Sequence, residues 1–173
     1  SSVVFVSSME DALRYGPFDL VLFALKSYDT SAALETLKPY ADKMPPILCL
    51  SNGISNEQAI ARVAGKEKVI YGTVTTAVGR RGPGDIVLER LRGVGIAKGH
   101  PLVASLFVAF ENALLNPRLF DDAMEMKWSK LLTNLIANPT SAILDMTAAE
   151  ILANRKLYKL EVEMLRECLA VMK

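Results

Sequence analysis

A lysine ammonium and two carboxamides stand at intervals of four residues in the C-terminal half of the chain: Lys130, Asn134 and Asn138. On an α-helix each step of four residues turns by about 400°, so the three side chains drift by only roughly 80° and share one face. The ammonium can donate a proton, and each carboxamide can donate and accept hydrogen bonds. The spacing therefore predicts a helix face that suits a polar ligand.

Polar residues at this spacing are also typical of the solvent-exposed face of an amphipathic helix, and that alternative stays open here. Two features favour a ligand-binding face. Asparagine is a poor helix former, and two asparagines within two turns are hard to explain by helix propensity. Apolar side chains between Trp128 and Ile136 occupy the rest of the circumference and indicate a buried helix, in which polar groups need partners. Pro139 follows the second asparagine, so we expect the helix to end or kink there.

The segments that must position this helix alternate between short apolar runs and helix-like stretches. The apolar runs predict strands at residues 3–6, 19–25, 47–50 and 69–75, and the intervening segments predict helices at 9–15, 31–41 and 56–64. Such alternation predicts a parallel sheet with helices on both faces. Ligands bind beyond the carboxyl ends of the strands in this architecture, where Lys26 and Asn52 stand. A solvated loop lysine and a plain Asn-Gly turn remain the alternatives for these two residues.

The pattern changes near residue 80, where the alternation of strands and helices stops. We expect a loop at residues 80–84 and paired antiparallel strands at 85–89 and 94–97, which would extend the edge of the sheet. From residue 102 onward the sequence predicts only helices, at residues 102–114, 123–138, 148–153 and 156–172. The sequence therefore predicts an α/β domain over residues 1–98, followed by a helical domain over residues 99–173.

Composition excludes several classes of partner. The 20 Lys and Arg residues balance 19 Asp and Glu residues, so charge gives no reason to expect nucleic acid or an anionic membrane surface. Cys49 and Cys168 lack metal-ligand spacing, which predicts reduced thiols and no metal site. The longest apolar run, residues 102–110, is far shorter than the ~20 residues needed to span a bilayer. His100, the only histidine, stands between Gly and Pro and is expected in a loop. These features predict a cytoplasmic protein.

Four stretches, in this order along the chain, resemble ketopantoate reductase, also called 2-dehydropantoate 2-reductase. They are residues 19–30 with Lys26 after the strand, residues 50–53 with Asn52, residues 72–78 ending at Val78, and the pattern Trp128-x-Lys130-x-x-x-Asn134-x-x-x-Asn138-Pro139. The last stretch is the most specific of the four. Together the stretches extend over most of the chain.

This resemblance implies the NADPH-dependent reduction of ketopantoate, a 2-oxo acid, to pantoate in pantothenate and coenzyme A biosynthesis. It implies a site with Lys130 as the general acid, Asn134 and Asn138 as substrate ligands, and Lys26, Asn52 and the backbone of Val78 as contacts to NADPH or NADP. It leaves a homodimer open.

By the same comparison the chain is expected to be truncated at both ends. The Gly-rich phosphate loop should precede residue 1, and later C-terminal helices should follow residue 173. The expected fold is therefore the C-terminal part of a Rossmann-type parallel sheet with a short antiparallel extension, followed by the start of an all-helical domain. We expect the 173-residue chain alone to be inactive, because the cofactor pyrophosphate normally sits on that loop.

One departure from the family pattern keeps a second enzyme function open. Many members carry a further substrate-contacting asparagine where this sequence has Ala148. A related NAD(P)-dependent dehydrogenase of another 2-oxo acid is therefore the first alternative. A non-catalytic nucleotide-binding or assembly module, whose Lys and Asn side chains are merely solvated, is the second.

Overall fold

The computed structural model describes residues 3–172, which fall into two compact units. The first unit ends at Ala123 and the second begins at Met124. The sequence predicts a division after residue 98, but the structure keeps the next helix and strand with the sheet of the first unit.

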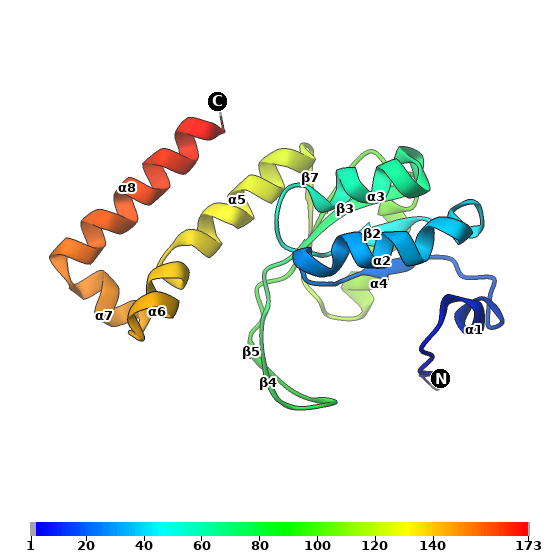
Figure 1. The fold of residues 1–173 in the computed structure, drawn as a ribbon, viewed down its shortest axis with the longest axis horizontal. Helices are drawn as coiled ribbons and strands as arrows, with labels where there is room; N and C mark the ends of the chain where they lie inside the picture. The colour runs from blue at the N-terminus through cyan, green and yellow to red at the C-terminus, as the bar shows by residue number, and fades with distance from the viewer. Residues whose placement is uncertain (1–2, 173) are drawn as a thin grey trace. The chain divides into compact units, whose positions relative to one another are not determined.

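The first unit, drawn in blue, cyan and green in Figure 1, is built on a five-stranded sheet. The strand order is β1-β2-β3-β6-β7. Its strands are β1 (Val21–Phe23), β2 (Ile47–Cys49), β3 (Val69–Val74), β6 (Val94–Ala97) and β7 (Pro117–Phe120). The first three are parallel, β6 pairs antiparallel with β3, and β7 pairs parallel with β6. The predicted α/β fold, a parallel sheet with an antiparallel extension, is confirmed, and three of the four predicted parallel strands form. The strand expected at residues 3–6 does not form.

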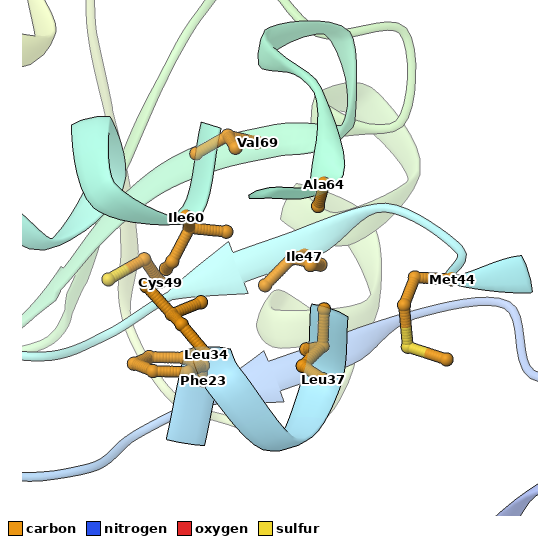
Figure 2. Close-up of a cluster of buried hydrophobic side chains, with 9 residues drawn as sticks. All are labelled: Phe23, Leu34, Leu37, Met44, Ile47, Cys49, Ile60, Ala64 and Val69. Carbon is orange, nitrogen blue, oxygen red and sulfur yellow. The ribbon is translucent and has the colours of Figure 1, made fainter. Parts of the chain in front are cut away.

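Helices cover both faces of the sheet because its central strands are apolar on both sides. Ile47 and Cys49 point to one face, where they pack against side chains of α2 (Thr30–Leu37) and α3 (Asn56–Ala64), as Figure 2 shows. Leu48 points to the opposite face, as the two-residue period of a strand requires, and lies in a second cluster with residues of α4 (Val103–Asn112). The shorter helices of this unit are α1 (Met9–Leu13), η1 (Ser27–Asp29), η2 (Lys38–Lys43) and η3 (Lys66–Lys68).

Three predictions for residues 80–120 are wrong. Residues 80–84 are not a loop, because residues 80–82 belong to β4 (Ala77–Gly82) and only residues 83–84 form the turn to β5 (Asp85–Arg90). The two strands form a separate antiparallel ribbon. The partner of β5 is therefore β4 rather than β6, which joins the main sheet instead. The segment after α4 was expected to hold no strand, yet it contains β7. This strand is only four residues long and partly exposed, so it carries no apolar run that the sequence reveals.

The second unit consists of α5 (Ala123–Leu135) from its second residue on, α6 (Asn138–Leu144), α7 (Ala148–Ala153) and α8 (Arg155–Val171). The helix predicted over residues 123–138 is wrong in its last turn, since the chain breaks after Leu135 and a new helix begins at Asn138. Ala137 has the left-handed backbone angles φ 60° and ψ −16°, which no continuous α-helix allows. The predicted end or kink beside Pro139 is thus confirmed. In the described part of the chain, no helix combines the length and the apolar character needed to cross a membrane.

Candidate functional site

Lys26 and Asn52 occupy equivalent places beyond two paired strands. Phe23, the last residue of β1, lies in register with Cys49, the last residue of β2. Each polar residue follows the end of its strand by three positions, and both are exposed. The two loops therefore leave the same edge of the sheet side by side, which is where parallel sheets bind ligands.

Hydroxyl groups tie these two loops together on both sides of Lys26. The Ser51 hydroxyl donates to the carbonyl oxygen of Leu25 at 2.7 Å. On the other side, the Ser27 hydroxyl donates to the carbonyl oxygen of Asn52, also at 2.7 Å. The residues flanking Lys26 are thus bonded to the Asn52 turn, while the Lys26 side chain remains exposed at the edge.

Asn56 is the centre of this network, and the sequence analysis identified it only as the start of a helix. Its side chain is 3% exposed. Its Nδ2 group donates to the carbonyl oxygen of Asn52 at 2.7 Å and to the Ser27 hydroxyl at 3.2 Å, and its Oδ1 atom accepts from the Thr30 hydroxyl at 2.8 Å. One buried carboxamide therefore links the Lys26 loop, the Asn52 turn and the first residue of α2.

Gly53 completes the turn for a conformational reason. Its φ of +98° lies in the left-handed region that L side chains rarely adopt. A Cβ atom there would also lie 3.4 Å from both Asn56 Nδ2 and Ser27 Oγ. The Asn-Gly pair that the sequence offers as a plain turn is therefore a turn packed against the network.

Val78 lies away from the end of the strand where the sequence analysis put it. Strand β3 ends at Val74, and the N–H groups of Thr75 and Thr76 both donate to the carbonyl oxygen of Gly93. Val78 is the second residue of β4, paired with Leu88 and 51% exposed. Its contact with the cofactor stays a prediction.

In the second unit, Lys130 and Asn134 stand one turn apart on α5, and both side chains are half-buried. Asn138 is exposed and is the first residue of α6, so the single helix face predicted for all three residues is wrong for Asn138. The expected core position of α5 is also wrong, because only Met126 and Lys127 are buried along it. The triplet is instead arranged across a break between two helices.

That break is held by a residue that the sequence analysis missed. Glu161 on α8 is 2% exposed, and its carboxylate accepts the Ala137 N–H at 2.7 Å and the Thr140 hydroxyl at 2.5 Å. The sequence does contain one sign that Glu161 is buried. It lies four residues after Leu157 and four before Leu165, so it interrupts the apolar stripe of α8.

His100 lies in a loop and bonds to the backbone. The Nδ1 atom of His100 accepts the N–H of Leu102 at 3.1 Å at the start of α4, which confirms the predicted loop position. Within residues 3–172, no group of three or more His, Cys, Asp and Glu side chains is arranged to hold a metal ion.

Comparison with known families identifies the group of proteins to which this chain is related. The family model described as ketopantoate reductase PanE/ApbA matches residues 2–99. This chain belongs to the ketopantoate reductase family. The model of the C-terminal part of the same family matches residues 122–173.

Individual members of the ketopantoate reductase family give the same result. The chain is 31% identical over 154 residues to a 2-dehydropantoate 2-reductase of Pyrococcus horikoshii, covering 86% of this chain and 50% of that protein. The crystal structure of 2-dehydropantoate 2-reductase from Geobacter metallireducens superimposes with a TM-score of 0.82 at 29% identity, covering 95% of this chain and 55% of that one.

A D-mandelate dehydrogenase solved with NADH shares the fold at 22% identity with a TM-score of 0.77. The match covers 89% of this chain and 53% of that one. The chain thus spans about half the length of the relatives it matches.

Proposed function

We propose that this chain is part of an NADPH-dependent 2-dehydropantoate 2-reductase, which reduces ketopantoate to pantoate in pantothenate biosynthesis. The observation that carries the proposal is the pair Lys130 and Asn134, one turn apart and half-buried on α5, in a chain of the ketopantoate reductase family. We further propose a cytoplasmic homodimer.

The proposed chemistry assigns the proton to Lys130. Bound NADPH supplies the hydride that reduces the substrate's carbonyl carbon. The Lys130 ammonium donates its proton to the carbonyl oxygen, so that the 2-oxo group becomes a hydroxyl and the lysine is left neutral. The carboxamides of Asn134 and Asn138 bind the hydroxyl and carboxylate groups of the substrate, because each can both donate and accept.

The edge of the sheet in the first unit suits the cofactor. An exposed ammonium at Lys26 would attract the 2′-phosphate that distinguishes NADPH from NADH. The side chain of Asn52 is exposed, while its carbonyl oxygen is occupied by Ser27 and Asn56, so the carboxamide is available for the nicotinamide ribose. We assign the backbone of Val78 to a further contact with the cofactor.

Ala148 supports a second candidate function. It is exposed at the first position of α7, where many family members carry an asparagine for the substrate. A different 2-oxo acid would then be the substrate, and NADH would be the alternative cofactor. A non-catalytic nucleotide-binding module is the remaining alternative.

The test uses a polypeptide that contains this chain and has the full length of its relatives, hereafter the full-length protein. NADPH and NADH oxidation are followed with ketopantoate and with a panel of other 2-oxo acids. We expect the highest kcat/KM for ketopantoate with NADPH. A higher kcat/KM for another 2-oxo acid would identify the alternative dehydrogenase. No oxidation of NADPH or NADH with any of the acids would identify the non-catalytic nucleotide-binding module. We expect no turnover by the 173 residues alone.

A further inference from the structure

The carboxylate of Glu161 is buried, and the chemistry proposed for this family member does not use it. Burying a carboxylate is costly unless it is hydrogen-bonded, so its partners show what it stabilises. Both partners in the described structure belong to the start of one helix: the N–H of Ala137 and the hydroxyl of Thr140. The carboxylate thus holds a segment that lies 21 to 24 residues earlier in the chain.

The segment that Glu161 holds contains Asn138. Ala137 precedes this residue and Thr140 follows it by two positions, so one carboxylate fixes the backbone on both sides of it. The first N–H groups of a helix have no partner within that helix, and a negative charge near them is favourable. Pro139 brings no N–H to this turn, and the Ala137 N–H just before Asn138 bonds to Glu161.

The backbone at Ala137 needs such an anchor. A left-handed residue other than glycine is strained and persists only where the surroundings hold it. Ala137 is 1% exposed with a φ of 60°, and its carbonyl oxygen accepts the N–H of Ser141 at 2.8 Å. This residue sets the angle at which the chain leaves α5, which carries Lys130 and Asn134, and enters α6.

We propose that Glu161 is a positioning residue for substrate binding, because its carboxylate fixes the break between α5 and α6 and thereby places Asn138 relative to Lys130 and Asn134. The proposal rests on the proposed function, in which these three side chains face the 2-oxo acid. Glu161 itself does not touch the substrate. Its effect is expected in the KM for the 2-oxo acid, since a misplaced ligand group weakens substrate binding.

The test compares Glu161→Gln with Glu163→Gln in the full-length protein. Glu163 lies two positions further on the same helix, is exposed and pairs with Arg166, so it controls for the loss of one negative charge. We expect Glu161→Gln to raise the KM for ketopantoate about tenfold, as the loss of roughly one well-placed hydrogen bond does. The Kd of NADPH, measured by its fluorescence, should not change. Glu163→Gln should leave both values unchanged.

Thr140 offers a milder pair of variants that keeps the carboxylate in place. Thr140→Val removes the hydroxyl that donates a hydrogen bond to Glu161, whereas Thr140→Ser retains a hydroxyl at this position. We expect Thr140→Val to raise the KM for ketopantoate. Thr140→Ser should keep the KM of the unsubstituted protein. A loss of stability alone would lower the amount of active protein without this difference in KM, and equal KM values for the two variants would overturn the proposal.

Asn138→Ala separates a failure of this proposal from a failure of the proposed function. A normal KM for ketopantoate in Asn138→Ala would remove Asn138 from the substrate site, and the proposed function would lose that assignment. A raised KM in Asn138→Ala with a normal KM in Glu161→Gln would overturn only the role of Glu161. We expect the double variant to resemble Asn138→Ala, because the carboxylate acts through that side chain. A KM for ketopantoate in the double variant that is raised by the product of the two single effects would contradict the proposal.

Discussion

The substitution Asn56→Ala tests whether the polar network at the sheet edge holds the two loops of the cofactor site. It removes three hydrogen bonds at once: those to the carbonyl oxygen of Asn52, the Ser27 hydroxyl and the Thr30 hydroxyl. The Ser27 hydroxyl still donates to Asn52, so that carbonyl keeps one partner. The Thr30 hydroxyl, in a residue that is 5% exposed, loses its bond to Asn56.

The magnitude follows from these contacts. A hydrogen bond in a folded protein contributes a net of about 1 kcal/mol, so three of them amount to roughly 3 kcal/mol. That is a large share of the roughly 5–15 kcal/mol that stabilises a typical domain. We therefore expect Asn56→Ala to lower the free energy of unfolding of the first unit by about 2–4 kcal/mol.

Urea unfolding followed by circular dichroism measures this change in the 173-residue chain. Gln58→Ala is the control, because Gln58 is exposed two positions further on the same helix. We expect the control to shift the free energy of unfolding by no more than about 0.5 kcal/mol. A double-mutant cycle with Thr30→Val should show a coupling of about 1 kcal/mol for the shared bond. A loss below about 1 kcal/mol for Asn56→Ala, within the contribution of a single bond, would refute the proposed importance of the network.

Two further predictions concern stability. Hydrogen bonds from Thr147 lower the pKa of Glu150 below its ordinary value of 4.5; the resulting stabilisation of α7 is present above that value and lost as pH falls through the lowered pKa. Circular dichroism should therefore show that acidification removes less helix from Glu150→Gln than from the unsubstituted protein. Equal losses of helix in the two proteins would contradict this role of Glu150. Gly72→Ala would place a Cβ atom 2.8 Å from Leu48 Cδ1 and 3.1 Å from the Cys49 carbonyl oxygen, so it should cost about 1–3 kcal/mol in urea unfolding. Gly82→Ala is the matched control with open space, and an equal cost in both would contradict the packing argument.

Much of the fold is predictable from the sequence because its signals are local. The bounds predicted for the helices at residues 56–64 and 148–153 agree with α3 and α7 to the residue. Both helices have clear start signals, and α7 carries a capping box between Thr147 and Glu150. The parallel strands are recognisable because burial on both faces makes them continuous apolar runs.

The errors arise where distant parts of the chain decide the structure. The antiparallel pairing of β6 with β3 joins two strands that the whole β4–β5 ribbon separates in the chain. The break after α5 is signalled by Pro139, but its geometry is held by Glu161 from another helix. No local pattern contains such a contact.

The candidate site divides in the same way. Lys26 and Asn52 could be placed at the sheet edge from the strand pattern alone, because each lies within three positions of the end of an apolar strand. The role of Asn56 could not, since its three partners lie four to 29 residues away in the chain. The shared face of Lys130, Asn134 and Asn138 assumed a continuous helix, and the left-handed residue Ala137 removes that continuity.

The central claim is that Lys130 donates the proton when the full-length protein reduces ketopantoate with NADPH. The most direct measurement is kcat for Lys130→Ala, with Lys159→Ala as the control at an exposed lysine on α8. General acid catalysis contributes about 10²–10⁴-fold, so Lys130→Ala should lose at least about 100-fold in kcat while the control retains it. Near-normal turnover by Lys130→Ala would contradict the account.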